Sequence, residues 1–308
     1  MNIILGSGVN AFAAKHILGD SYKILSAGPS RFYKFNPVPG DNFIYANENL
    51  KPLESVLSPL IGVKKADYRC AWSKGGSIIR GYNQFDAMMW LSKLFGIYTP
   101  GHIPYILQNR MEFKVYENRV NNLYSALYEK HKNSMSEFNL DSISKISPHN
   151  IHMKNGQIIE YDKLISTIPL DDLLKLMGCV DHGLKSVGVS AIRIRTSELN
   201  FEGFNQLWTV DPDISFYKSQ IVKEDEYIFY FNFKVERPAQ YISPYINDFD
   251  LLTGVWIEAA IPAGDLPYLN QLEDYGIIPL GMSAQWDFGM DFSSCLFRIM
   301  QIADGAIK

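Results

Sequence analysis

Short apolar runs alternate with helical patterns at the start of the chain. Residues 3–5 are apolar throughout, which predicts a central parallel strand that is buried on both faces. Residues 12–18 form a helical pattern that Gly19 ends, and residues 22–25 form a second short strand-like run. The first 26 residues therefore predict a strand, a glycine turn, a helix and a second strand.

The next region combines irregular sequence with two predicted helices and a hairpin. Residues 28–59 contain five prolines, which predicts irregular structure. Residues 84–95 and 118–132 predict helices. Asn155-Gly156 predicts the tight turn of a hairpin over residues 151–161. A strand over 164–168 and a short helix over 170–177 are expected to follow.

The pattern changes in the second half of the chain and then changes back. Between residues 187 and 261 the apolar positions recur with a period of two, which predicts an antiparallel sheet. Residues 276–281 again predict a buried strand that ends in glycine, and residues 293–307 predict an amphipathic helix. An α/β domain with an inserted second domain accounts for this order.

Composition narrows the classes of partner. The formal net charge is −4, and this balance gives no indication of a nucleic-acid surface. No apolar run is long enough to span a bilayer, and the three cysteines are scattered. The first strand leaves no room for a signal peptide. We therefore expect a soluble, cytoplasmic protein with a small-molecule substrate, and its oligomeric state is left open.

A Gly-x-Gly-x-x-Ala motif lies between the first predicted strand and the first predicted helix. Gly6 permits the tight turn, Gly8 lets the backbone approach a pyrophosphate, and Ala11 lets the helix pack closely on the strand. The start of the helix then offers free N–H groups to the anion. An ordinary glycine-rich turn is the alternative. The residues expected against the pyrophosphate are Gly6, Ser7, Gly8, Val9, Asn10 and Ala11.

The position that takes the ribose hydroxyls in such motifs carries no acid here. It is expected about 20 residues beyond the first glycine, at the end of the second strand. That residue is Ser26, and neither Leu25 nor Ala27 is acidic. Ser26 offers a weaker hydrogen bond to the ribose of FAD, or joins Arg31 to receive the 2′-phosphate of NADP. In a third interpretation the ribose is bound elsewhere.

Three segments in this order suggest a family: the turn at residues 3–11, the hairpin and strand at 155–169, and the C-terminal stretch at 276–291. Together they resemble the flavin amine-oxidase superfamily, particularly its UDP-galactopyranose-mutase-like branch. The resemblance implies an FAD-binding Rossmann-like parallel sheet with an inserted α+β substrate domain that contains an antiparallel sheet. We expect the FAD-binding domain to comprise residues 1–66, 136–178 and 268–308, and the substrate domain residues 67–135 and 179–267.

The resemblance also implies roles for residues near the C-terminus. FAD would bind in extended form, with Gly281 and Trp286 near its flavin end. Met282 stands where the family commonly has Arg or Asp. Met290 and Asp291, at the start of the last helix, would lie near the pyrimidine edge of the flavin ring. A helix N-terminus at that edge stabilises electron density on the ring.

Candidates for substrate binding lie outside the glycine motif. Arg193 and Arg195 share one face of a predicted strand and could bind an anion together, although a solvated strand face is the alternative. Arg80 and Trp286 are further candidates. Aromatic residues of the predicted sheet either line a substrate cavity or pack in the core, and we favour the core. They are Trp208, Phe216, Tyr217, Tyr230 and Trp256.

A metal site is not expected. His149 and His152, with Cys179 and His182, have spacings that occur in zinc sites. However, His149 and His152 flank the start of a predicted strand, where alternation separates neighbouring side chains. We interpret them as surface histidines and Cys179 as a buried cysteine.

These observations support three hypotheses. The first is an FAD-dependent oxidoreductase that transfers a hydride from an amine, amino acid or related small molecule to flavin N5. No dedicated catalytic side chain is predicted, because the flavin performs the redox chemistry. The second is a UDP-sugar mutase-like flavoenzyme without net redox change. The third is a protein that binds FAD or NADP without catalysis.

Overall fold

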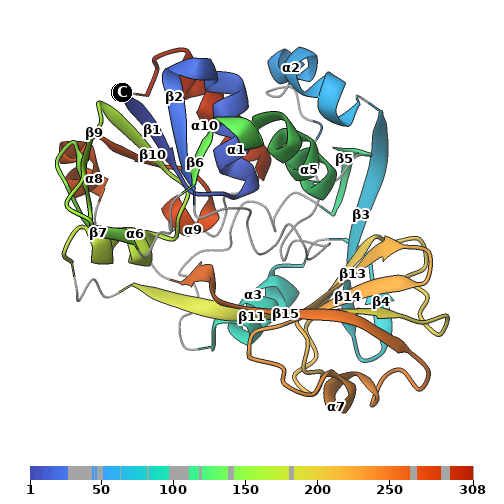
Figure 1. The fold of residues 1–308 in the computed structure, drawn as a ribbon. Helices are drawn as coiled ribbons and strands as arrows, with labels where there is room; N and C mark the ends of the chain where they lie inside the picture. The colour runs from blue at the N-terminus through green and yellow to red at the C-terminus, as the bar shows by residue number, and fades with distance from the viewer. Residues whose placement is uncertain are drawn as a thin grey trace. The chain divides into compact units, whose positions relative to one another are not determined.

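The computed structural model describes residues 1–26, 44, 46, 51–62, 64–81, 83–96, 111–117, 120–137, 142–179, 184–263, 269–285 and 292–307. The chain forms two compact units (Figure 1). Unit 1 contains Met1–Lys65, Tyr116–Leu184 and Asp265–Lys308, and unit 2 contains Ala66–Val115 and Lys185–Gly264.

Unit 1 is built on a parallel sheet. Within the described residues its strand order is β16 (Ile277–Pro279), β10 (Lys163–Ser166), β1 (Asn2–Leu5), β2 (Tyr22–Ser26) and β6 (Met135–Glu137). All neighbouring strands pair in parallel, so their C-terminal ends lie at one edge. The central strand is fully buried from Ile3 to Leu5, which confirms the prediction made from its apolar run.

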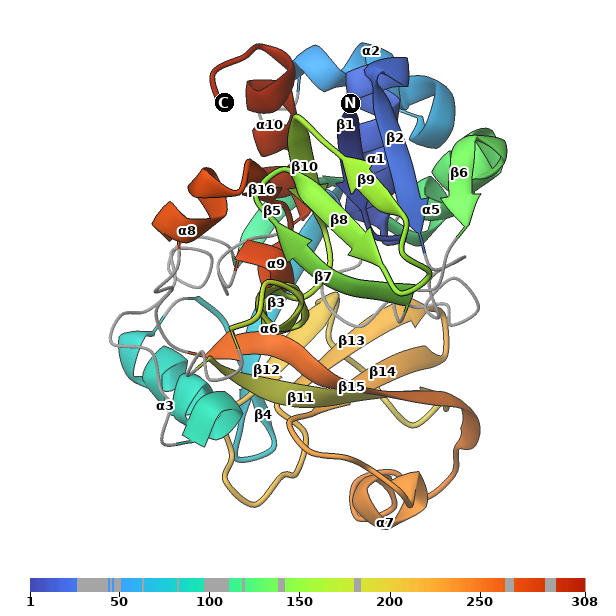
Figure 2. The same cartoon turned by 60° about the vertical axis from the view of Figure 1, so that its left-hand side comes forward.

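Helices cover one face of this parallel sheet, and a small second sheet covers the other. Ile4 packs in a core with α1 (Val9–Leu18), α5 (Val120–His131) and α10 (Phe292–Ala303). Ile3 and Leu5 pack in a second core with β7 (Ile143–Ser147), β8 (Asn150–Met153) and α6 (Leu170–Leu176). β9 (Ile158–Glu160) completes the three-stranded sheet, which lies in front of the parallel sheet in Figure 2.

Short elements complete unit 1. They are η1 (Gly19–Ser21), η5 (Lys132–Ser134), α2 (Lys51–Ile61), α8 (Leu269–Asp274) and α9 (Met282–Gln285). The expectation of irregular structure is wrong for residues 51–59, which belong to α2. Pro52 lies in the first turn, where the missing N–H has no helical partner to lose, and Pro59 lies in the last turn.

The placement of α5 differs from the expected domain division. Residues 116–135 were expected in the substrate domain, but the structure includes them in unit 1. Val120, Leu123 and Leu127 of α5 are buried in the same core as Phe12 of α1. The helical spacing predicted the helix, whereas the apolar surface on which it packs cannot be identified from spacing alone.

Unit 2 is built on a mixed, mostly antiparallel sheet. Its order is β15 (Asp250–Ala263), β11 (Lys185–Arg195), β14 (Glu226–Phe231), β13 (Lys218–Lys223), β12 (Gln206–Thr209), β3 (Lys65–Lys74) and β4 (Ser77–Ile79), and β5 (Glu112–Tyr116) pairs with β3. β12 and β3 pair in parallel. Unit 2 also holds α3 (Gln84–Phe95) and α7 (Pro238–Ile242).

Together the two sheets confirm the predicted fold class, a Rossmann-like parallel sheet with an inserted domain that contains an antiparallel sheet. Among the helices that the structure describes, none has the length and apolar character needed to cross a membrane.

Candidate functional site

The turn between β1 and α1 requires glycine at its first position. Gly6 has a φ of +130°, a conformation that residues with a Cβ rarely adopt. A Cβ placed on Gly6 would lie 2.1 Å from Oγ1 of Thr167, which follows β10. Thr167 also donates a hydrogen bond from Oγ1 to the carbonyl of Leu5, at 3.1 Å. The glycine therefore lets the chain leave β1 directly over the neighbouring strand end.

The surroundings of Gly8 differ from those of Gly6, which has Thr167 close to it. It caps α1 with φ −78° and ψ 176°, and no side chain forms a hydrogen bond as a cap. Among the residues that the structure describes, none has a heavy atom within 4 Å of a Cβ placed on Gly8. The first turn of α1 has no acidic residue. This turn therefore presents backbone N–H groups and the positive end of the helix dipole, and within the described residues no side chain stands close to Gly8, which suits an anion such as a pyrophosphate.

α5 holds the turn from the side. The hydroxyl of Tyr124 donates a 3.0 Å hydrogen bond to the carbonyl of Ser7. The ring of Phe12 packs edge-on against Tyr124 and Tyr128, with centroids 5.7 Å apart in both pairs. These contacts fix the backbone of the turn, and a preorganised backbone binds an anion with less loss of conformational freedom.

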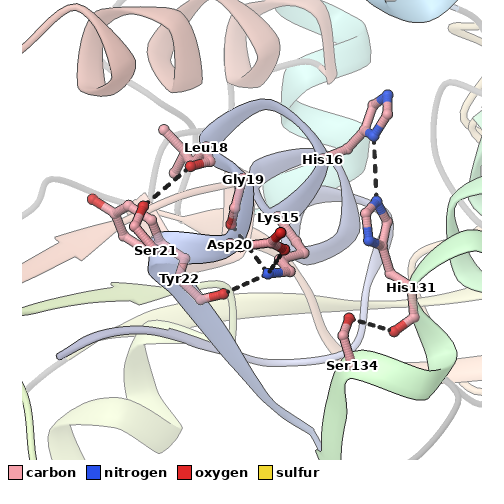
Figure 3. A network of polar contacts seen from close by, with 9 residues as sticks. All are labelled: Lys15, His16, Leu18, Gly19, Asp20, Ser21, Tyr22, His131 and Ser134. Carbon is pink, nitrogen blue, oxygen red and sulfur yellow. Dashed lines mark hydrogen bonds and ion pairs between the residues drawn. The ribbon is translucent and has the colours of Figure 1, made fainter.

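A polar network holds the other end of α1 (Figure 3). The buried ammonium of Lys15 donates hydrogen bonds to the carbonyls of Gly19 and Tyr22, at 3.1 and 2.8 Å, and pairs with Asp20 at 3.1 Å. His16 Nδ1 lies 3.3 Å from Nε2 of His131 on α5. α1 is thus fixed to both β2 and α5.

The late glycine lies beside the first helix. Gly281 follows β16 with a φ of +112°, and a Cβ on it would lie 2.5 Å from Asn10 Nδ2. Gly281 N donates to Gln285 Oε1 at 3.3 Å, which links the turn to α9. Met282 is the first residue of α9 and is half-buried. The structure therefore brings together Gly281 and the glycine motif, two parts of the predicted site from opposite ends of the sequence.

The end of β2 has a neighbour that the sequence pattern did not reveal. Ser26 is the last residue of β2 and pairs in register with Glu137, the last residue of β6. β6 has only three residues, so neither its presence nor its position next to β2 could be predicted from periodicity. Four predicted cofactor residues lie outside the described residues: Arg31, Trp286, Met290 and Asp291.

The two arginines of β11 surround a carboxylate. Glu226 is 2% exposed, and it accepts hydrogen bonds from Arg193 Nε at 3.0 Å and Arg195 Nη2 at 2.9 Å. Lys223 Nζ lies 3.0 Å from the same carboxylate. Burial raises the pKa of Glu226, but the hydrogen bonds from the three cations outweigh burial and lower the pKa to about 2. An anionic substrate at these arginines would compete with Glu226. Arg80 is exposed, with its guanidinium 5.3 Å from the ring centre of Phe204.

One face of the unit 2 sheet carries a chain of hydrogen bonds that sequence reasoning missed. The hydroxyl of Tyr230 donates to Gln220 Oε1 at 3.1 Å, Gln220 Nε2 donates to Tyr68 Oη at 2.9 Å, and Tyr68 Oη donates to Gln206 Oε1 at 3.4 Å. All four side chains are buried, and Lys218 Nζ lies 4.2 Å from the ring centre of Tyr230. Lys218 and Gln220, polar residues at alternate positions of β13, were the available signal.

The remaining candidates have structural partners. Trp208, Phe216, Tyr217 and Tyr230 are buried, and Trp256 is half-buried. His152 Nε2 lies 2.8 Å from Ser147 Oγ, and His149 Nδ1 lies 3.2 Å from the carbonyl of Tyr161. Cys179 Sγ contacts Gln271, and His182 lies outside the described residues. In the part of the chain that the structure describes, no three His, Cys, Asp or Glu residues gather as metal ligands.

Comparison with known proteins rests on structure. No protein-family model and no curated protein sequence matches this chain. The crystal structure of reduced UDP-galactopyranose mutase matches with a TM-score of 0.69 at 12% identity, over 100% of this chain and 96% of that chain. Glycine oxidase from Bacillus cereus matches with a TM-score of 0.57 at 12% identity, over 100% and 96% of the two chains.

A third structure shows the same arrangement in a longer protein. Aklavinone-11 hydroxylase, solved in a ternary complex with FAD and aklavinone, matches with a TM-score of 0.57 at 11% identity, over 99% of this chain and 62% of that chain. At these identities the similarity shows the fold. The chain therefore has the fold that the sequence resemblance implied.

Proposed function

We propose that this protein is an FAD-dependent oxidoreductase that oxidises an amine, an amino acid or a related small molecule. The observation that carries the proposal is the turn between β1 and α1, where an open Gly8 begins a helix without an acidic first turn. A fold shared with a hydroxylase solved with FAD supports this cofactor, and a fold shared with glycine oxidase supports the substrate class.

The residues present fit such a cofactor. Gly8 leaves open the space that a Cβ would fill, and Gly6 is required by its backbone and by Thr167. A diphosphate would therefore find backbone N–H donors there without displacing a side chain of the described residues. We propose that the pyrophosphate lies against Gly6, Ser7, Gly8, Val9, Asn10 and Ala11. The N–H groups of Gly6 and Ala11 already donate to the carbonyls of Leu25 and Gly8, so the donors to the anion would come from the residues between them. At the flavin end we propose Gly281, Met282, Trp286, Met290 and Asp291.

In this proposal the residues of the chain itself bind the cofactor and the substrate and hold them in position. FAD, when bound, supplies the hydride acceptor, so the chain needs no nucleophile for the redox step. The contacts of Tyr124 and Phe12 hold the α1 turn rigid, which fixes the position of a ligand bound there. The contact between Asn10 and Gly281 fixes the start of α1 relative to the end of β16. We propose Arg80, Arg193, Arg195 and Trp286 for substrate binding, but Arg193 and Arg195 bind the buried carboxylate of Glu226, so these two would take any substrate anion only by displacing it.

A second candidate is a UDP-sugar mutase-like flavoenzyme without net redox change. The similarity to reduced UDP-galactopyranose mutase over nearly both whole chains favours it. A sugar diphosphate needs at least two arginines to clasp it. Arg193 and Arg195 already bind the buried carboxylate of Glu226, which argues against that role. For this reason the oxidoreductase remains the first proposal, ahead of a non-catalytic FAD or NADP protein.

The absorption spectrum of the purified protein tests the proposal. Visible flavin bands that leave the protein on denaturation are the expected result. Anaerobic addition of glycine and other small amino acids and amines should then bleach these bands. Bands that only dithionite bleaches, together with turnover of a UDP-sugar, would support the mutase instead. A colourless protein that FAD does not stabilise against heat, but NADP does, would reject the flavoenzyme.

A further inference from the structure

β15 forms one edge of the sheet of unit 2. It is 14 residues long, and within the described residues it pairs with β11 and ends the strand order on that side (Figure 2). A strand that is bonded to a neighbour on one side only directs about half of its backbone N–H and C=O groups outward. Another strand can pair with these groups, so the edge of β15 can accept one more strand.

The regular part of this edge is the segment 253–257, which we call the edge segment. It pairs without interruption with residues 189–193 of β11, and a shift of register follows at each end. Such shifts are β-bulges, which bend a strand and interrupt regular pairing. A partner strand would therefore pair mainly with the edge segment.

The edge segment lacks the features by which proteins usually protect an open strand. Charged side chains and proline are the common protections, and the segment reads Thr, Gly, Val, Trp and Ile. Gly254 is exposed, and the other four residues are partly exposed. Trp256 has no aromatic or hydrogen-bond partner among the residues that the structure describes. A partly exposed tryptophan on an unprotected strand is typical of a surface that binds another protein.

The sequence of the edge segment is complementary to itself. When two copies pair antiparallel about Val255, Trp256 of each copy lies opposite Gly254 of the other, and Thr253 lies opposite Ile257. An aromatic side chain opposite a glycine covers the backbone that the glycine leaves exposed. The remaining positions are β-branched, which favours pairing between strands. This arrangement places no like charges opposite each other within the segment.

We infer that this protein forms a symmetric dimer in which the edge segments of two chains pair antiparallel about Val255. The unit 2 sheets of the two copies then form one continuous sheet across the twofold axis. A second copy is the occupant that the segment itself favours, because the same residues provide both sides of each pair. The dimer does not depend on the proposed flavin chemistry.

Sedimentation velocity of the full-length protein tests the inference. Wild-type protein should change from monomer to dimer between about 1 and 100 μM. Val255→Lys and Val255→Glu should each stay monomeric over this range, because each variant places like charges opposite each other at the axis. An equimolar mixture of the two variants should dimerise again, since a lysine then lies opposite a glutamate.

A control variant and a second measurement separate pairing from folding. Phe297→Lys is the matched control, because Phe297 is an exposed apolar residue of α10 and lies outside the sheet of unit 2. It should dimerise as wild type does. Hydrogen exchange of wild-type protein needs no substitution: amides of the edge segment should exchange more slowly in the dimer than in the monomer. If circular dichroism shows that a charged variant is unfolded, the exchange measurement decides.

Three results would overturn the inference. The first is wild-type protein that stays monomeric over the whole range, which would leave the edge to an extended segment of another protein. The second is a dimer that persists in folded Val255→Lys, or whose edge segment exchanges as fast as in the monomer. The third is a mixture of the two folded, charged variants that stays monomeric. A colourless protein that still dimerises in this way would reject the proposed function and leave this inference in place.

Discussion

Asn10 and Gly281 lie against each other, although they stand near opposite ends of the chain. A Cβ on Gly281 would lie 2.5 Å from Asn10 Nδ2, and the φ of Gly281 is +112°. Glycine is therefore required at this position by its backbone conformation and by its neighbour. The contact joins the start of α1 to the chain that leaves β16, which are two parts of the proposed cofactor site.

Gly281→Ala should lower the free energy of unfolding by about 3 kcal/mol, because backbone strain and the clash with Asn10 act together. Urea denaturation of both proteins measures this difference. Gly305→Ala is the matched control: Gly305 also has a positive φ, +73°, but no described residue has a heavy atom within 4 Å of a Cβ placed there. It should lose only about 1 kcal/mol through strain. Equal losses in the two variants would contradict a specific contact with Asn10.

Gly8→Ser should separate the stability of α1 from nucleotide binding. Serine is favoured over glycine as an N-cap, and the extended backbone of Gly8 suits a capping side chain. The variant without nucleotide should therefore be as stable as wild type, or more stable by a few tenths of a kcal/mol. The added side chain occupies the open space in front of the turn, so FAD should bind at least tenfold more weakly. Thermal melts with and without FAD measure both effects, and FAD stabilisation equal to wild type would disprove the pyrophosphate site.

Local sequence patterns predicted β1, β2, β10 and β16 of the parallel sheet because these strands are short and mostly apolar, but they did not predict β6. β1, its turn and α1 follow from the first 19 residues, and Asn155-Gly156 marks the hairpin of β8 and β9. The sequence pattern does not predict α2 because prolines favour breaks, whereas Pro52 lies in its first turn and Pro59 in its last. The unit to which α5 belongs was missed because it depends on contacts distant in sequence.

The parts of the candidate site whose residues are close together in the sequence could be predicted. The parts whose residues meet only through the pairing of distant strands could not. The turn at residues 6–11 has a sequence signature, because Gly6 is needed for the tight turn and Gly8 lets the backbone approach a pyrophosphate. Arg193 and Arg195 were correctly placed on one face, but their shared partner Glu226 lies on another strand.

Glu226→Gln should destabilise unit 2 at neutral pH by roughly 3 kcal/mol, the lower end for a broken buried ion pair. The expected loss of stability is at the lower end of this range because the side chains of Arg195 and Lys223 are exposed to water. Glu236→Gln is the control, since Glu236 pairs with Lys234 at 3.7 Å and both side chains are exposed. It should cost less than about 1 kcal/mol. Denaturation at pH 7 compares the two variants.

The same variant has a defined dependence on pH. The pKa of Glu226 falls to about 2 in the folded protein, below its usual value of 4.5. The ionised carboxylate therefore adds stability above pH 4.5, and this contribution is lost as the pH falls towards 2. The difference between wild type and Glu226→Gln should narrow over this range. A difference that stays constant from pH 7 to pH 3 would contradict the ion-pair account.

His131 should make the stability of unit 1 fall in mild acid. Burial, with smaller contributions from the nearby His16, Lys130 and Lys15, lowers the pKa of His131 to about 4. An unfolded histidine takes up its proton near pH 6.5, so stability is present above that pH and is lost as the pH falls towards 4. His131→Gln removes the titrating group, so wild type should lose about 1 to 2 kcal/mol more than the variant between pH 7 and pH 5. Urea denaturation at both pH values measures this difference, and parallel losses in the two proteins would show that the His16–His131 pair does not control the acid response.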